Sequence, residues 1–208
     1  FYFDGEWHYR NNGTFELGAA EGGRNIFLMG MNYLSECMDS REALNTYYLK
    51  TIHHEFTHIL HQTVEFSTAY QFITTDYKVD KCFESEFADV LSRGFIRDYA
   101  QKNYHEGFAG VVSTYVTSTA DEWEALLKKA SYAPVKDKDG NLVYDSNGLV
   151  VADTKTKANG RDLIEQKLSI VRSYMQDQWG IDIDELRASI LQRENDVVNG
   201  KVDLKNLD

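Results

Sequence analysis

Two histidines and a glutamate within five consecutive residues are the part of this sequence best suited to chemistry. The five residues are His54, Glu55, Phe56, Thr57 and His58, an HExxH motif. On a helix, residues four apart lie on one face with Cβ atoms about 6 Å apart, so both imidazoles can reach one zinc ion at about 2.0–2.1 Å. The glutamate points about 100° away from the first histidine, where it can take a proton from a metal-activated water. The spacing therefore indicates a zinc hydrolase.

The motif lies within residues 45–62, which have helical periodicity. At 100° per residue, the histidines fall on one side of the helix and an apolar stripe falls on the other. The predicted stripe consists of Tyr48, Leu49, Ile52, Phe56, Ile59 and Leu60. We therefore expect a helix that packs its stripe on the core and presents its histidines to a cleft. A scaffold helix with solvated histidines and no metal is the alternative.

Two more histidines accompany the motif. His53 lies off the expected ligand face, so we predict a flanking position for it. His61 shares the ligand face, but it is seven residues beyond His54, which is about 10.5 Å along the helix axis. A straight helix cannot bring all three imidazoles to one ion. We therefore expect His61 to support a ligand or to line the cleft.

A catalytic zinc usually has three protein ligands and one position for water. The metzincin continuation of the motif is excluded, because His61 and Val64 stand where it requires glycine and histidine. A glutamate from a downstream segment is the other common solution. The candidates in this sequence are Glu65, Glu84, Glu86 and Glu106.

The four candidate glutamates differ in their surroundings. Glu65 lies three turns beyond His54, too far along a straight helix. Glu84 and Glu86 fall in a predicted amphipathic helix at 81–101, where acidic side chains can simply be solvated. Glu106 has small neighbours, which would let its helix approach another helix closely. These neighbours are Gly107, Ala109 and Gly110.

Three stretches together resemble a known family. They are HHEFTHILHQ (53–62), GFIRDYAQKNYHEGFAG (94–110) and YMQDQWGIDIDELRASI (174–190). They look like zinc-binding metallopeptidases of the gluzincin type, and they are similar to substrate-import-associated zinc metallohydrolase lipoproteins, which are encoded beside bacterial outer-membrane nutrient-import systems. The resemblance covers about residues 25–195.

In that family the downstream segment commonly carries a glutamate followed by Asp-Phe-Ala-Glu. The resemblance therefore implies Glu106 as the third zinc ligand, with Phe108 and Ala109 matching the pattern. Gly107 and Gly110 depart from it, because acids usually stand at these two positions. Two supporting carboxylates are thus absent, which bears on metal affinity and turnover.

The resemblance also implies a fold, a cofactor and partners. The expected fold is α+β and zincin-like, mostly helical, with a small mixed sheet over the active-site helix. The expected cofactor is Zn²⁺, bound by His54, His58 and Glu106, and the expected substrate is a peptide or protein. An outer-membrane nutrient-import complex is an expected partner. The implied location is the cell envelope, in the periplasm or as an outer-membrane surface lipoprotein.

In the expected mechanism, Glu55 is the general base and a tyrosine stabilises the developing oxyanion. The tyrosines beside Glu106 are the candidates, namely Tyr99, Tyr104 and Tyr115. A second hypothesis comes from another functional class. The acids missing at Gly107 and Gly110 favour a non-catalytic module of an import system that binds peptide or glycan without cleaving it.

Composition narrows the functional classes further. The 208 residues are 42% hydrophobic and 13% aromatic, which is typical of a folded protein. The net charge is −11, and the sequence has no stripe of basic residues that could neutralise phosphates. Nucleic-acid binding is therefore not expected. We expect a single domain over residues 1–208 without a transmembrane span. Because the sequence starts at Phe1 without a methionine, we expect an export segment to be missing from it.

The remaining elements follow from periodicity and turn residues. Residues 1–35 should form short strands, and 25–31 should line the cleft as an edge strand or lie inside the sheet. Glycines at 140 and 148 predict a β-meander over 136–154. Helices are expected at 41–64, 81–101, 106–118, 120–131, 160–179 and 182–197, the last with Asp182 as its N-cap. Cys37 and Cys82 are either bridged or two buried thiols.

Overall fold

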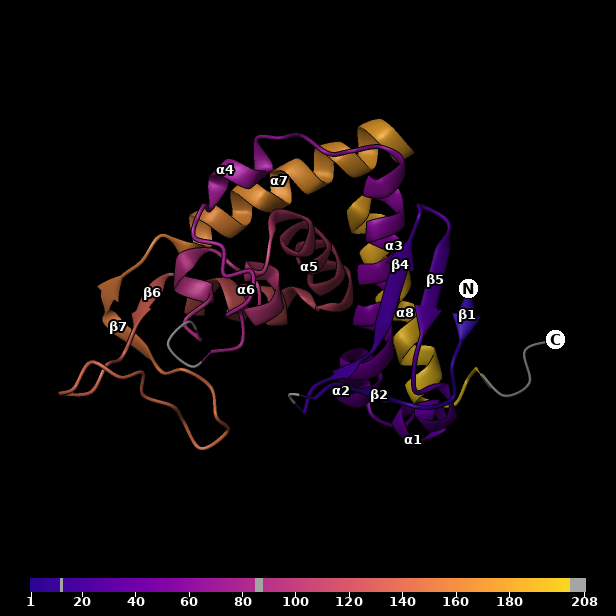
Figure 1. Cartoon of the computed structure of the whole chain (residues 1–208), viewed down its shortest axis with the longest axis horizontal. Coiled ribbons are helices and arrows are strands. Elements are labelled where there is room, and N and C mark those ends of the chain that lie inside the picture. The colour runs from indigo at the N-terminus through magenta and orange to yellow at the C-terminus, as the bar shows by residue number, and fades with distance from the viewer. Residues whose placement is uncertain (12, 85–87, 203–208) are drawn as a thin grey trace. The chain divides into compact units, whose positions relative to one another are not determined.

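The computed structural model describes residues 1–11, 13–84 and 88–202, which form helices and short strands (Figure 1). The chain forms two compact units. The first consists of residues 1–65, 112–118 and the segment from 178 onward, and the second consists of 66–111 and 119–177. A single domain over the whole chain stays a prediction. The α+β class is confirmed, because long helices accompany small antiparallel and mixed sheets.

A three-stranded mixed sheet lies at the start of the first unit. Its order is β1 (Tyr2–Phe3), β5 (Asn25–Leu28) and β4 (Gly18–Glu21), with β1 parallel and β4 antiparallel to β5. The turn between β4 and β5 contains Gly22 and Gly23 at φ 62° and 64°, a left-handed conformation that glycine adopts without steric cost. A separate hairpin pairs β2 (His8–Tyr9) with β3 (Phe15–Glu16).

The position of β5 decides between two alternatives. Residues 25–31 were predicted either to line the cleft as an edge strand or to lie inside the sheet, and β5 is the central strand. The edge strand is β4, which lies along α3 (Lys50–Thr63) in Figure 1. The sheet therefore does cover the motif helix, but through a strand of small residues that the sequence analysis did not single out.

The helices of the first unit are η1 (Met31–Tyr33), α1 (Leu34–Cys37), α2 (Arg41–Leu44), α3 and α8 (Ile183–Val198). The helix expected over 41–64 is confirmed with one change. Between α2 and α3, Asn45–Leu49 forms a π-helical turn in which the Lys50 N–H donates to the Asn45 carbonyl. Asp182 is the N-cap of α8 as predicted, since its side chain accepts from the N–H groups of Asp184 and Glu185.

The predicted apolar stripe of α3 is confirmed only in part. Tyr48 and Leu60 are buried and Leu49, Ile52 and Ile59 are half-buried, but Phe56 is 42% exposed. On the other side of the helix, Thr51, His54 and Glu55 are buried as well. One reason is that β4 packs on the Thr51 and Glu55 side of the helix, so this polar side is covered too.

The second unit contains the elements drawn from purple to orange in Figure 1. They are α4 (Tyr70–Ile73), η4 (Leu91–Arg93), η5 (Asp98–Gln101), α6 (Ala120–Ala130), β6 (Tyr132–Pro134), β7 (Ala152–Lys157) and most of α7 (Gly160–Trp179). Helix α5 (Tyr104–Thr117) contributes to both units, with residues up to 111 in the second. An aromatic cluster forms the core, where Phe66 and Phe108 stack at 3.9 Å.

Two expectations for this unit have opposite outcomes. The helix predicted over 81–101 is wrong in the part that the structure describes, where turns and the 3₁₀ segments η4 and η5 replace it. The meander over 136–154 is confirmed, since Gly140 and Gly148 occupy its turns at φ 86° and 73°. Cys37 and Cys82 are both buried and free.

Lys167 is a buried lysine in the second unit. It is 1% exposed, its Nζ donates to the Gly94 carbonyl at 2.8 Å, and it lies 4.5 Å from the centre of the Phe95 ring. Burial lowers the pKa of this amine to about 7. Burial therefore disfavours the protonated lysine in the folded protein at neutral pH.

This lysine predicts a pH dependence of stability. In the unfolded chain the amine keeps its proton up to the ordinary value of 10.5, so the unfolded state binds more protons between pH 7 and 10.5. The contribution of Lys167 to the free energy of unfolding should therefore rise with pH from about 7, and below pH 7 it should be constant. Urea denaturation of Lys167→Met should lack this rise. The exposed Lys157→Met is the control, and equal slopes in both variants would contradict the prediction.

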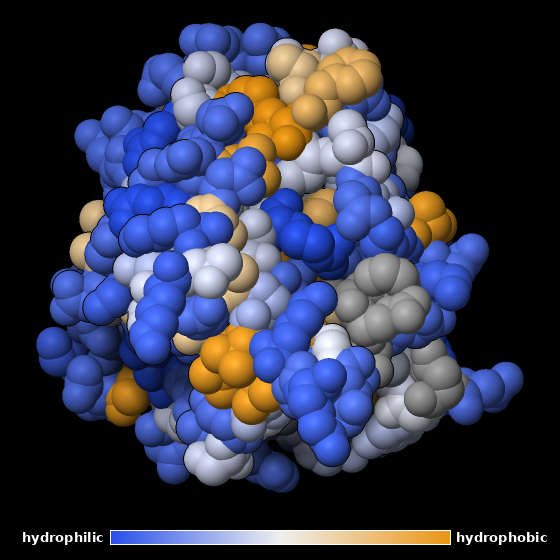
Figure 2. Space-filling view, turned by 90° about the vertical axis from the view of Figure 1, so that its left-hand side faces the viewer, coloured by the Kyte–Doolittle hydropathy of each residue, from blue (hydrophilic) through white to orange (hydrophobic). Residues whose placement is uncertain are grey.

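The surface is mostly hydrophilic. On the face shown in Figure 2, hydrophilic residues predominate and hydrophobic residues form only small separate patches. Among the described residues, no helix is long and apolar enough to cross a membrane.

Candidate metal centre

The two histidines of the motif face each other one helical turn apart on α3. The Nε2 atoms of His54 and His58 are 3.1 Å apart, and their rings are nearly perpendicular. Two nitrogen ligands on one tetrahedral zinc, each at about 2.0–2.1 Å, are about 3.3 Å apart. The separation of the pair therefore fits a single zinc ion bound by both nitrogens.

His61 contacts the other side of His58. Its Nε2 atom lies 2.7 Å from His58 Nδ1, and the side chain is buried. A metal-ligating histidine usually donates its second ring N–H to a partner, which fixes the ring and leaves the remaining nitrogen for the metal. His61 lies where such a supporting residue would be, as the sequence predicts. His53 is a neighbour on α3, and burial lowers its pKa to about 4.

Glu55 is buried beneath the edge strand. Its side chain is 8% exposed, and a Cβ atom added to Gly18 would lie 2.9 Å from Glu55 Cγ and 2.8 Å from Thr51 Cγ2. The strand can therefore approach α3 this closely only because residue 18 has no side chain. Gln62 also links α3 to β4 and the turn after it, because its side-chain amide accepts from the Gly23 N–H and donates to the Ala20 carbonyl. Strand β4 thus fixes the stem of Glu55.

Glu106 lies in the second unit, in the first turn of α5. The Asn103 side chain accepts from the Glu106 N–H at 2.9 Å and so caps the helix. Lys102 Nζ is 3.5 Å from Glu106 Oε1, and the glutamate side chain is 13% exposed. Burial first, and the charge of Glu106 next, raise the pKa of the Tyr99 hydroxyl, which also hydrogen-bonds to Glu106. The carboxylate is therefore oriented by a cation and a phenol.

Close packing explains why Gly107 and Gly110 depart from the family pattern. A Cβ at Gly107 would lie 3.1 Å from the Ala100 carbonyl oxygen, and one at Gly110 would lie 3.2 Å from Ile96 Cγ2. An acid at 107 would be forced against a carbonyl oxygen. In this chain the neighbours of Glu106 are therefore Lys102 and Tyr99, and the sequence analysis singled out only the tyrosine.

The other candidates have different surroundings. Glu65 is exposed, Glu84 pairs with Lys81 at the surface, and Glu86 lies outside the described residues. Among the tyrosines, Tyr115 donates its hydroxyl to Asp184 on α8, which indicates a structural role. The Tyr104 ring lies 4.1 Å from the His105 ring and is tilted by 41° to it, and the role of Tyr104 as an oxyanion donor stays a prediction.

Comparisons with known proteins identify a family for this chain. Residues 1–184 match the family described as "Putative zinc-binding metallo-peptidase". A crystal structure of a protein with the same description, from Bacteroides caccae ATCC 43185, is 30% identical with a TM-score of 0.68. The match covers 95% of this chain and 65% of that chain, so this chain spans slightly less than two thirds of that protein. No curated protein matches the chain.

Proposed function

The chain belongs to the zinc-binding metallo-peptidase family, and we propose that it is a zinc-dependent peptidase of the HExxH, gluzincin type. The observation that carries the proposal is the geometry of α3. The Nε2 atoms of His54 and His58 lie 3.1 Å apart, and the buried carboxylate of Glu55 belongs to the same helical turn. A scaffold helix would have no reason to bury His54 and Glu55 beside a half-buried His58.

We propose Glu106 as the third ligand. Its carboxylate is already oriented by Lys102, and its helix is shared between the two units. The later residues of α5 belong to the same unit as α3, where Asn45 and Arg41 donate to the carbonyl of Thr117. A glutamate on a helix anchored in this way is a reasonable partner for two histidines from another helix.

In the proposed mechanism, bound zinc would lower the pKa of water towards about 7 and polarise the substrate carbonyl. The protein supplies the proton transfers. Glu55 accepts a proton from the attacking water and delivers it to the leaving amine. Its burial under β4 holds the carboxylate in place, and Tyr99 and Lys102 orient Glu106. His61 holds the tautomer of His58.

The edge strand suggests how a peptide substrate is held. Within the part of the chain that the structure describes, β4 pairs with one strand, β5, and Gln62 donates to the Ala20 carbonyl, so the remaining backbone groups of its outer edge can pair with an extended peptide. Gly18, Ala19 and Ala20 would allow the peptide to approach closely. We propose this strand, in place of residues 25–31, as the substrate-binding edge.

A chelator experiment tests the proposed function. We expect the zinc-loaded chain to cleave members of a broad peptide library, a chelator to abolish cleavage, and added zinc to restore it. Peptide capture without cleavage would instead support the binding module favoured by the glycines at 107 and 110. Membership of an outer-membrane import complex and a cell-envelope location remain proposals that follow from the resemblance alone.

A further inference from the structure

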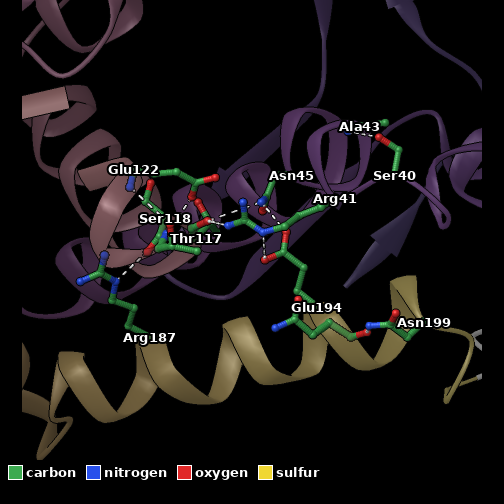
Figure 3. A network of polar contacts seen from close by, with 12 residues as sticks. Ser40, Arg41, Ala43, Asn45, Thr117, Ser118, Glu122, Arg187, Glu194 and Asn199 are labelled. Atoms are coloured by element: carbon green, nitrogen blue, oxygen red, sulfur yellow. Dashed lines mark hydrogen bonds and ion pairs between the residues drawn. The ribbon is translucent and has the colours of Figure 1, made fainter. Parts of the chain in front are cut away.

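We propose that a buried polar cluster positions the zinc-binding helices. We call it the clamp and define it as Arg41, Asn45, Thr117 and Glu194, which lie in the first unit (Figure 3). It joins α2, the π turn, the end of α5 and α8. The inference rests on the proposed function, because its effect would be on the zinc ligands of α3 and α5.

A buried carboxylate is the centre of the clamp. The side chain of Glu194 is completely buried, and it accepts from Arg41 Nε at 3.0 Å and from Asn45 Nδ2. Burying a carboxylate away from water costs free energy unless hydrogen bonds compensate for it. The Arg41 and Asn45 groups that donate to Glu194 must therefore stay in place. Both donors come from the segment that leads directly into α3.

The same two donors hold the end of α5. The carbonyl of Thr117, the last residue of this helix, accepts from Arg41 Nη2 at 3.2 Å and from Asn45 Nδ2 at 3.4 Å. Carbonyls in the last turn of a helix have no partner within the helix, and cations favour this end of the helix dipole. Arg187 on α8 adds a further bond of 2.7 Å to the Ser118 carbonyl.

The Asn45 side chain indicates that the clamp fixes the orientation of the helices at a cost in stability. Its side-chain amide donates to both acceptors, while its Oδ1 atom has no hydrogen-bond partner within the described part of the chain. A buried acceptor without a partner costs stability that an apolar side chain would avoid. Asn45 also opens the π turn, which sets the rotation of α3. π turns are frequent at functional sites.

The clamp can act on the ligands because both helices are rigid. His54 is nine residues beyond Asn45, and Glu106 is eleven residues before Thr117, so the ligands lie about 14 Å and about 17 Å along their helix axes. Fixing the helix ends therefore fixes where the ligands point. Zinc sites tolerate deviations of only about 0.2 Å in ligand distance, so a small shift at the clamp should reduce affinity.

The test is the zinc affinity of Glu194→Gln, which keeps the shape of the side chain and places an amide against the clamp's donors. We expect the variant to fold, as measured by circular dichroism, and to bind zinc about 10–100-fold more weakly in a chelator competition assay. Bound Co²⁺, used as a spectroscopic probe, should give an altered visible spectrum. Arg41→Lys keeps the charge but loses the planar guanidinium that joins Glu194 through Nε to Thr117 through Nη2, and it should weaken zinc binding in the same direction.

Val197→Ala is the matched control. Val197 is on the same helix, three residues beyond Glu194, and packs with Leu44 and Tyr48 in the hydrophobic core. This variant should lose stability but bind zinc and Co²⁺ like the wild type. Wild-type affinity in both clamp variants, or an equal loss in Val197→Ala, would overturn the clamp while leaving the proposed function intact. A wild-type chain that binds no zinc would overturn both.

Discussion

Glu55→Gln is expected to bind zinc normally and to hydrolyse peptides about 10²–10⁴-fold more slowly than the wild type. The amide is nearly the same size as the carboxylate, so it should fit under β4 beside Gly18. It cannot accept the proton of the attacking water, and the proton transfer is therefore lost. The measurement is kcat on a cleaved library peptide, together with zinc content from elemental analysis.

Gln166→Glu is the matched control for this change, because it makes the reverse exchange of amide and acid at an exposed position of α7, away from the motif helix and β4. It should leave kcat within a small factor of the wild type. Unchanged hydrolysis in Glu55→Gln would show that another residue is the base, and loss of zinc in that variant would show that Glu55 is needed for binding.

His58→Ala is expected to lose stoichiometric zinc. The change removes one of the two Nε2 atoms that lie 3.1 Å apart, and it also removes the contact partner of His61. One imidazole and one carboxylate are too few for a protein zinc site. After dialysis, the zinc content measured by elemental analysis should fall from about one ion per chain to nearly none.

The control for zinc loss is His8→Ala. His8 is a histidine of β2 in the same unit that pairs with Asp4 at the surface. It should keep its full zinc content, because the predicted ligands are untouched. Equal zinc in His58→Ala and in the wild type would mean that the metal lies elsewhere.

The pairing of the two motif histidines could be predicted because it depends on local spacing. His54 and His58 are four residues apart on a helix, and this alone determines that their rings meet. The position of His61 followed in the same way from its distance along the axis. The Asp182 cap and the glycine turns of the meander were also local, and the structure confirms them.

Contacts between distant segments could not be predicted. Phe56 is exposed while Thr51 and Glu55 are buried under β4, and the periodicity of α3 does not show which side of the helix this strand covers. The missing helix over 81–101 is a similar case, because helix propensity and amphipathic pattern are only weak evidence. Lys102 was missed because a lysine four residues before a glutamate is common on any helix surface.

The most direct test of the central claim is the anomalous diffraction of zinc in a crystal of the loaded chain. The account predicts one strong peak at about 2.0–2.2 Å from His54 Nε2, His58 Nε2 and a carboxylate oxygen of Glu106. A zinc peak away from the two histidines, or one coordinated by an acid other than Glu106, would contradict it.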